Sequence, residues 1–402
     1  MIDTNLVKIR KEKNYYLCYF VESRKVINVN KTGAKIIDLF FNKKHYSNVL
    51  NKNKNFLKEL KEILKKDHRG GFPFIKEEQM DVPIIAELQL NTLCNLRCKH
   101  CCQKEYDKSM NIKKIENILK ILHKAKIFEI NLVGGELFLR PDIYKIVTLC
   151  CKKYNFAVNI ITNGTLLSEK LIEKLALFKN NLAFLISIEG INEHNDEIRG
   201  KGTFKKIEKT LQLLRKNKIY FETSTTINAI NIKHWKEITD YCEKLGISCN
   251  FNLFKPFKLT QQELIIKPNK YFKFIEEIFK YRTTHNSHIG LTNAAIVANM
   301  TKGDPRKECK ATLSGLTIDV NGKMIPCPFL KGAGYYNGKN LPNFSKNFIN
   351  KWKTNYWFKD FRKGNLNECQ TCSYIFCGDK NKVNPYGLIA FKRHLKNKNY
   401  GT

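Results

Sequence analysis

Short apolar runs alternate with amphipathic stretches between residues 84 and 253. The stretches Asn111–Lys126, Thr203–Lys216 and Ile232–Gly246 place apolar residues on one helical face. The runs between them predict six buried strands: Ile84–Leu90, Phe128–Val133, Ala157–Ile161, Leu182–Ile188, Ile219–Thr226 and Ile247–Leu253. Six β/α units in series predict an α/β fold, a parallel sheet curled into a partial (β/α)6 TIM barrel. The loops at the carboxyl ends of its strands are then available for chemistry.

The chain before this region predicts a smaller unit. Strands are expected at Tyr15–Val21 and Lys25–Asn30, a helix opening at Asn30, and a second helix at Phe56–Lys65. This order favours a winged-helix-like module over residues 1–75. We assign residues 82–300 to the barrel, and residues 301–402, which hold a second group of cysteines, to a C-terminal extension.

Charge and hydropathy limit the classes of function. The 402 residues include 71 Lys and Arg against 37 Asp and Glu, a net charge of +34. The lysines are spread along the whole chain, so we favour a solvated basic surface over a nucleic-acid site, which needs clustered charge. No apolar run approaches the roughly 18 residues of a membrane span, and the N-terminus lacks the pattern of a secretory signal. We therefore expect a cytoplasmic protein with no membrane partner.

The 14 cysteines fall into groups. In a reducing compartment, clustered cysteines are more often metal ligands than disulfides. Three lie within eight residues, and five lie in the C-terminal quarter. For the other six we expect small buried hydrophobic side chains; they are Cys18, Cys102, Cys150, Cys151, Cys242 and Cys249.

The sharpest motif is Cys94-Asn-Leu-Arg-Cys98-Lys-His-Cys101, directly after the first predicted barrel strand. Three thiolates can hold three irons of a [4Fe–4S] cluster and leave the fourth open to a chelating ligand. A zinc knuckle is the alternative, although no fourth ligand shows the usual paired spacing. The segment resembles the CxxxCxxC loop of the radical SAM superfamily. That resemblance implies S-adenosylmethionine (SAM) on the open iron, cleavage to a 5′-deoxyadenosyl radical, and His100 packing on the adenine.

Other segments resemble the family's SAM-binding motifs, each at the end of a successive predicted strand. Gly134-Gly135-Glu136 matches the GGE(P) motif, with Leu137 in place of the proline. The resemblance further implies SAM contacts from Thr162 and Asn163, from Ser187 and Glu189, and from Arg199, which would face the SAM carboxylate. Taken singly, each of these segments would be a turn or a cap. Glu189 stands where relatives commonly have Asp.

The C-terminal cysteines resemble the SPASM/twitch extension, which binds auxiliary [4Fe–4S] clusters. They are Cys309, Cys327, Cys369, Cys372 and Cys377. One auxiliary cluster on the first four is the economical interpretation, and a tetrahedral zinc site on the same residues is the alternative. Cys377 is then a substitute ligand, part of a second site, or a free thiol.

The N-terminal module resembles the PqqD-like precursor-recognition element, which captures a leader peptide by β-augmentation. A helix-turn-helix for DNA is the competing interpretation. The whole chain thus resembles peptide maturases of the sactipeptide type, which form thioether cross-links. This implies a precursor-peptide substrate, hydrogen abstraction by the adenosyl radical, and a low-potential electron donor such as flavodoxin or ferredoxin. An epimerase, a sulfatase-maturase-like side-chain oxidase, and a basic zinc-bound nucleic-acid regulator remain alternatives; no residue identifies a catalytic acid or base.

Overall fold

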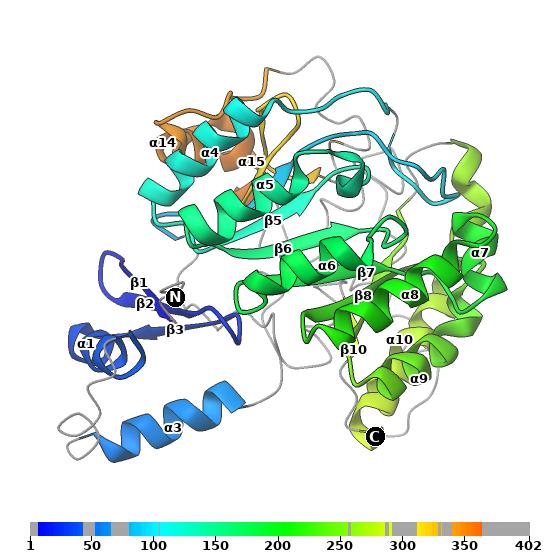
Figure 1. Cartoon of the computed structure of the whole chain (residues 1–402), viewed down its shortest axis with the longest axis horizontal. Helices are drawn as coiled ribbons and strands as arrows, with labels where there is room; N and C mark the ends of the chain where they lie inside the picture. Colours follow the sequence, from blue (N-terminus) through cyan, green and yellow to red (C-terminus); the bar gives the residue numbers. More distant parts are fainter. Residues whose placement is uncertain are drawn as a thin grey trace.

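A single nine-stranded sheet forms the centre of the protein (Figure 1). The computed structural model describes residues 7–42, 53–65, 80–103, 105–255, 259–285, 289–291, 312–328, 331 and 340–363. In order across the sheet, the strands are β10 (Ile289–Leu291), β9 (Cys249–Leu253), β8 (Tyr220–Ile227), β7 (Leu182–Ser187), β6 (Ala157–Thr162), β5 (Glu129–Val133), β4 (Ile85–Gln89), β11 (Gly315–Ile318) and β12 (Met324–Ile325). All neighbours pair in parallel except β11 and β12. The predicted α/β class and all six predicted barrel strands are confirmed.

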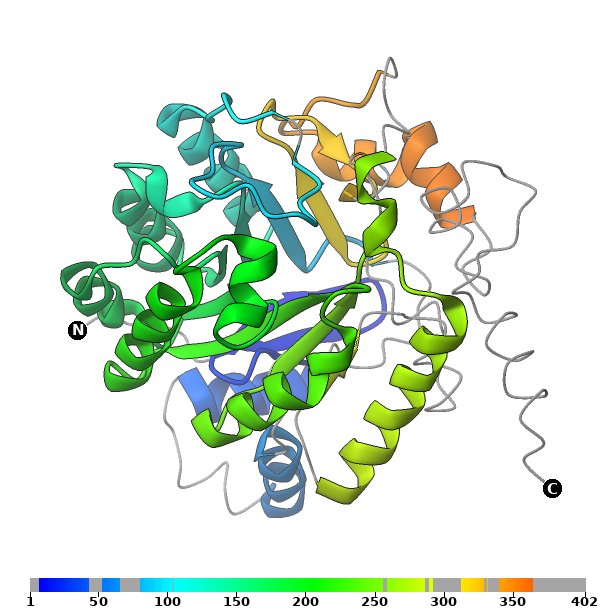
Figure 2. The same cartoon turned by 90° about the vertical axis from the view of Figure 1, so that its right-hand side faces the viewer.

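Two short strands extend the sheet beyond the predicted six. β10 adds to β9, and β11 adds to β4 with Thr317 opposite Glu87. Helices α14 (Phe348–Thr354) and α15 (Tyr356–Lys363) lie near the β11–β12 end of the sheet (Figure 2). The Trp352 indole Nε1 donates to the Gly315 carbonyl at 3.1 Å. The first part of the predicted C-terminal extension therefore continues the barrel sheet. None of the helices described is long and apolar enough to cross a membrane.

The N-terminal module is a three-stranded antiparallel sheet with helices on one face. Its strands are β1 (Val7–Lys11), β2 (Tyr16–Phe20) and β3 (Lys25–Val29). Helix α1 (Lys31–Ile37) begins where the Asn30 side chain accepts from the Gly33 amide, and α3 (Lys54–Lys65) follows. The sequence analysis missed β1, because three of its five residues are basic. Cys18 and Phe20 of β2 join the core beneath the helices, whereas Leu17 and Tyr19 join the core of the barrel.

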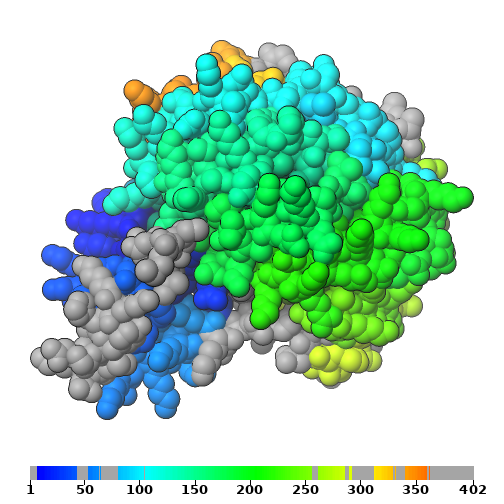
Figure 3. Space-filling view, in the orientation of Figure 1, coloured from blue at the N-terminus to red at the C-terminus, as the bar shows by residue number. Residues whose placement is uncertain are grey.

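This module packs against the barrel (Figure 3), and its contacts lie at the amino ends of the barrel strands. Lys8 Nζ donates to the Phe128 carbonyl at 3.2 Å, just before β5. Tyr19 Oη donates to Glu129 Oε2 at 2.5 Å, and Arg24 Nη2 donates to the Asn181 carbonyl at 2.7 Å, just before β7. Arg24 Nη2 also donates to the Val158 carbonyl of β6 at 3.1 Å, so side-chain donors join the module to three successive barrel strands, at the end opposite the strand-end loops.

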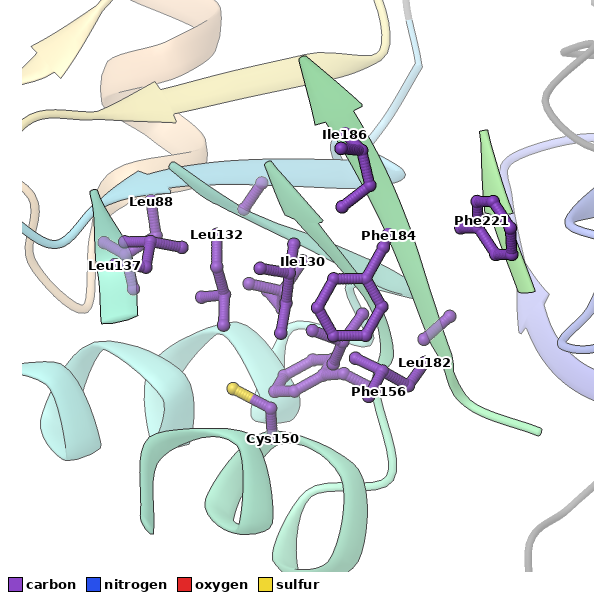
Figure 4. Close-up of a cluster of buried hydrophobic side chains, with 14 of the residues drawn as sticks. Leu88, Ile130, Leu132, Leu137, Cys150, Phe156, Leu182, Phe184, Ile186 and Phe221 are labelled. Carbon is purple, nitrogen blue, oxygen red and sulfur yellow. The ribbon is translucent and has the colours of Figure 1, made fainter. Parts of the chain in front are cut away.

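Helices cover the outer face of the barrel sheet. They are α4 (Ile112–Lys124), α5 (Ile143–Thr148), α6 (Glu169–Leu175), α7 (Glu193–Arg199), α8 (Thr203–Lys216), α9 (Trp235–Leu245) and α10 (Pro268–His285). Leu88, Ile130 and Leu132 are fully buried between sheet and helices (Figure 4). Because side chains alternate along a strand, the neighbours Glu87 and Asn131 point to the opposite, inner face. The inner face therefore carries polar groups, which suit a polar ligand.

Candidate functional site

The cysteine loop leaves the carboxyl end of β4 and returns beside it. The Thr92 amide donates to the Lys108 carbonyl, and the Met110 amide to the Leu90 carbonyl, both at 2.8 Å. The Arg97 guanidinium lies 3.7 Å from the centre of the Tyr106 ring and stiffens the intervening loop. The predicted motif is therefore held as a closed loop over the end of β4.

The three motif cysteines share one polar environment. All described cysteines are thiols rather than halves of disulfides. The Leu96 amide lies 3.4 Å from Cys94 Sγ, and the Gln103 amide lies 3.3 Å from Cys101 Sγ, so both amides point at sulfur. Burial raises the pKa of Cys98 to about 11; Arg199 opposes this, and the thiols of Cys101 and Cys94 add to it. Burial raises the pKa of Cys94 as well. A metal cluster, whose positive charge stabilises thiolates, would offset this cost at both residues.

Gly134 and Gly135 let the loop after β5 pack against the start of the cysteine loop. A Cβ on Gly135 would lie 2.1 Å from the Leu93 carbonyl oxygen, and one on Gly134 would lie 2.3 Å from Asn91 Oδ1. The next amide, that of Glu136, donates to the Leu93 carbonyl at 2.6 Å. The glycines thus serve a close approach between two protein segments, and this approach fixes the residue before Cys94.

The Glu136 carboxylate ties three strand ends together. It is fully buried and accepts from Thr162 Oγ1 at 2.8 Å, from the Asn163 amide at 2.8 Å and from the Phe138 amide at 3.0 Å. Asn163 Nδ2 in turn donates to Asn95 Oδ1 in the cysteine loop at 2.9 Å. Burial raises the pKa of Glu136, and these donors oppose the rise. The predicted residues Glu136, Thr162 and Asn163 are therefore brought together, with protein donors at both carboxylate oxygens.

Glu189 gathers a second group at the end of β7. Its Oε1 accepts from Arg199 Nη2 at 3.1 Å and lies 3.4 Å from His100 Nε2, while Oε2 accepts from the Thr226 amide at 2.8 Å. Burial raises the pKa of Glu189 to about 7, although Arg199 opposes it. Burial, and next the Arg199 charge, lower the pKa of His100 to about 3, so its imidazole is neutral. Three predicted residues from three segments thus converge.

Two atoms of this group lack protein partners. Within the described residues, His100 Nδ1 and Arg199 Nε are buried with no hydrogen-bond partner. A buried unsatisfied polar atom is costly, and such atoms in a native fold commonly face a ligand. Ser187, the last residue of β7 and two residues before Glu189, is half-buried on the inner face of the sheet. The residues present therefore fit a polar cofactor beside the three thiols.

Sequence reasoning missed several buried amides that hold these residues. Asn91 Nδ2 donates to the Glu136 carbonyl at 3.0 Å, and Asn231 Nδ2 to the Glu189 carbonyl at 3.0 Å. Gln261 Nε2 donates to the Lys99 and Cys101 carbonyls at 3.0 and 3.1 Å. The first two look like ordinary turn residues in sequence, and Gln261 lies 160 residues from the loop it braces.

The remaining cysteines divide between confirmed and wrong predictions. Cys18, Cys150, Cys151, Cys242 and Cys249 are buried as expected, but Cys102 is exposed, because it follows Cys101 in the loop. Cys327, two residues after β12, is buried. Cys309, Cys369, Cys372 and Cys377 lie outside the described residues.

Comparisons with known proteins agree with this geometry. Residues 88–247 match the family model described as the Radical SAM superfamily. The antilisterial bacteriocin subtilosin biosynthesis protein AlbA of Bacillus subtilis is 30% identical over 172 residues, 42% of this chain but only 38% of AlbA. The mycofactocin maturase MftC of Mycobacterium tuberculosis is 23% identical, covering 74% of this chain and 78% of MftC. The crystal structure of Streptococcus suis SuiB bound to its precursor peptide SuiA has the same fold, with a TM-score of 0.68, 16% identity and 90% of each chain covered.

Proposed function

Because residues 88–247 match the model of the Radical SAM superfamily, we propose that the chain is a radical SAM enzyme that matures a ribosomally synthesised peptide by forming a thioether or related cross-link. The observation that carries the proposal is the closed loop of three thiols at the end of β4, beside the buried, unpartnered atoms of His100 and Arg199. The names of AlbA and MftC, which refer to bacteriocin biosynthesis and maturation, and the peptide bound by SuiB support a peptide substrate.

The residues of the site have separate tasks in this proposal. Cys94, Cys98 and Cys101 would hold a [4Fe–4S] cluster, and His100 and Arg199 would bind SAM. When bound, this cluster and SAM supply a radical able to remove a hydrogen atom from a peptide carbon. Neutral His100 offers Nδ1 as an acceptor and Arg199 offers Nε–H as a donor, so both orient the cofactor.

Glu136 has a positioning task. Its carboxylate already accepts from three protein donors, and a carboxylate has about four acceptor sites, so about one remains for a ligand amine. Its main effect is to hold Thr162 and Asn163 against the cysteine loop. Ser187 and the polar inner face of the barrel then line the space that a substrate would enter. Buried walls exclude water from that space.

The N-terminal module is the proposed leader-binding element. An extended leader would pair with an edge of its small sheet, where backbone hydrogen bonds supply affinity. β3 is one edge of the three-stranded sheet, and near it Lys25 Nζ donates to the Leu64 carbonyl of α3 at 3.1 Å. A leader between β3 and α3 would sit on a module anchored by Arg24 and Tyr19.

Auxiliary and external electron carriers complete the proposal. We assign at least one auxiliary [4Fe–4S] cluster to Cys309, Cys327, Cys369 and Cys372, and Cys377 is a substitute ligand, part of a second site, or a free thiol. A flavodoxin or ferredoxin of the cytoplasm would supply the low-potential electron. A peptide epimerase or a side-chain oxidase uses the same cofactor and remains the second candidate. The zinc-bound nucleic-acid regulator finds no support among the relatives.

The test is anaerobic co-expression with each short open reading frame beside the gene, followed by mass spectrometry of the peptide. Cross-linking predicts the loss of a pair of hydrogen atoms per modification and a thiol that no longer reacts with an alkylating agent. The Cys98→Ala variant is the matched control and should leave the peptide unchanged. An unchanged mass with deuterium uptake from heavy water would instead assign epimerisation.

A further inference from the structure

Three metal-binding side chains converge outside the cysteine loop. His194 lies in α7, His234 ends the short helical turn η5 (Ile232–His234), and Glu237 lies in the first turn of α9. His194 Nδ1 is 2.9 Å and His234 Nδ1 is 3.5 Å from the same oxygen, Glu237 Oε2. One ligand atom from each residue lies within 4.8 Å of the other two.

These separations suit a small tetrahedral ion. Zinc binds imidazole nitrogen and carboxylate oxygen at about 2.0–2.1 Å, which places neighbouring ligand atoms roughly 3.3 Å apart. The two nitrogen–oxygen distances lie on either side of that value. The imidazole rings stack face to face with centroids 3.6 Å apart, so one ring must turn out of the stack before both nitrogens can point at one ion.

The chemistry of the donors favours a borderline-soft ion over a hard one. Imidazole nitrogen suits zinc, whereas Mg²⁺ and Ca²⁺ prefer all-oxygen sites. The side chains of His194, His234 and Glu237 are 32%, 18% and 40% exposed, so an ion can enter from solvent and keep a water ligand.

The backbone around the cluster is rigid and belongs to the catalytic end of the barrel. A Cβ on Gly190 would lie 2.7 Å from His194 Cβ, so glycine there allows α7 to approach the end of β7. The residue after His194, Asn195, accepts from the Glu189 amide at 3.0 Å. The His234 amide donates at 2.9 Å to the carbonyl of Asn231, whose side chain donates to the Glu189 carbonyl. The cluster and Glu189 therefore share one scaffold.

We propose that His194, His234 and Glu237 form a zinc site that joins α7 to α9 at the carboxyl end of the barrel. The ion takes two imidazole nitrogens, one carboxylate oxygen and solvent. None of its ligands is one of the cysteines assigned to iron–sulfur clusters, and the site does not depend on the peptide chemistry. By fixing α7, the site would hold Arg199 of the same helix in place.

The test uses the full-length, tag-free enzyme with its iron–sulfur clusters reconstituted anaerobically, dialysed against Zn²⁺. Metal analysis should find about one zinc per chain beyond the iron. His194→Ala and the more conservative Glu237→Gln should each weaken zinc binding by at least roughly 100-fold. The matched control, His285→Ala, removes an exposed histidine at the end of α10 and should bind zinc as the wild type does. Equal iron in all four proteins checks that the fold and clusters are intact.

Zinc-edge X-ray absorption identifies the ligands directly. The expected spectrum has only nitrogen and oxygen neighbours, with imidazole scattering. A sulfur shell at about 2.3 Å would place the zinc on cysteines and overturn the proposal. Equal zinc affinity in wild type and His194→Ala, or displacement of the zinc by millimolar Mg²⁺, would also overturn it.

Discussion

Replacing Arg10 with alanine should release the N-terminal module from the barrel. Arg10 is 3% exposed, and its guanidinium donates to three carbonyls that precede β4 and β5, at 2.8–3.1 Å; they belong to Val82, Pro83 and Lys126. Its Nε also pairs with buried Glu12 at 2.6 Å. Removing one partner of a buried ion pair costs about 3–5 kcal/mol, because the other charge stays buried. At about 1.4 kcal/mol per tenfold, opening of the module should become roughly 10² to 4 × 10³ times more frequent.

Native-state hydrogen exchange of the anaerobic holoenzyme measures this opening. Amides of β1 to β3 should exchange faster by that factor, while amides of β5 and β6 keep their protection. SAM cleavage without peptide should stay at the wild-type rate, and peptide modification should fall. Lys11→Ala is the matched control, since it removes a neighbouring but exposed basic side chain. Unchanged hydrogen-exchange rates for β1 to β3 in Arg10→Ala would refute the inference that Arg10 holds the module on the barrel.

Other perturbations test the barrel itself. Burial raises the pKa of Glu87 from its ordinary 4.5 to about 7, so the folded protein keeps a proton that the unfolded chain loses, and stability should fall as the pH rises through that window. Glu87→Gln should remove this slope and gain about 1–3 kcal/mol at pH 8, with little change at pH 4.5, in anaerobic urea titrations. Glu189→Gln should leave Arg199 buried without its charge partner, so SAM binding measured by calorimetry should be weaker. Glu193→Gln, which changes an exposed carboxylate, should leave SAM binding unchanged. Cys98→Ala should lower the iron content by about four per chain and abolish SAM cleavage, and retention of that iron would contradict the ligand assignment.

The barrel could be predicted because its strands are buried and its helices are amphipathic. Strand predictions such as Ala157–Ile161 agree with β6 to one residue, since continuous apolar runs mark strands covered by helices. β10 and β11 are three and four residues long, too short for a periodic signal, and their place depends on pairing with distant β9 and β4. β1 was missed because Arg10, although basic, is buried by contacts about 70 to 120 residues away.

The residue types of the site were predictable from the sequence, but their hydrogen-bond and ion-pair partners were not. Strand order alone places Cys94, Glu136 and Glu189 at one end of a parallel sheet. The sequence analysis expected Arg199 to face the SAM carboxylate, and in the structure one of its nitrogens is committed to Glu189 while Nε has no partner among the described residues. Which atoms of Arg199 pair with Glu189 depends on the side-chain geometry between two residues that lie 10 apart in sequence. The pattern of residue types along the chain does not encode that geometry.

The length of the barrel strands sets a minimum distance for any peptide that contacts both the N-terminal module and the cysteine loop, which lie at opposite ends of these strands. The module contacts β5 at its first residue, Glu129, and the strand ends at Val133, just before the Gly134–Glu136 turn. A five-residue strand spans about 16 Å, so a leader bound at the module and a residue held at the thiols are at least that far apart. An extended chain covers this distance with about five residues, and a path around the barrel needs more. Because buried contacts from Arg10, Tyr19 and Arg24 fix the module on the barrel, the barrel would set this minimum spacing for a leader bound as proposed.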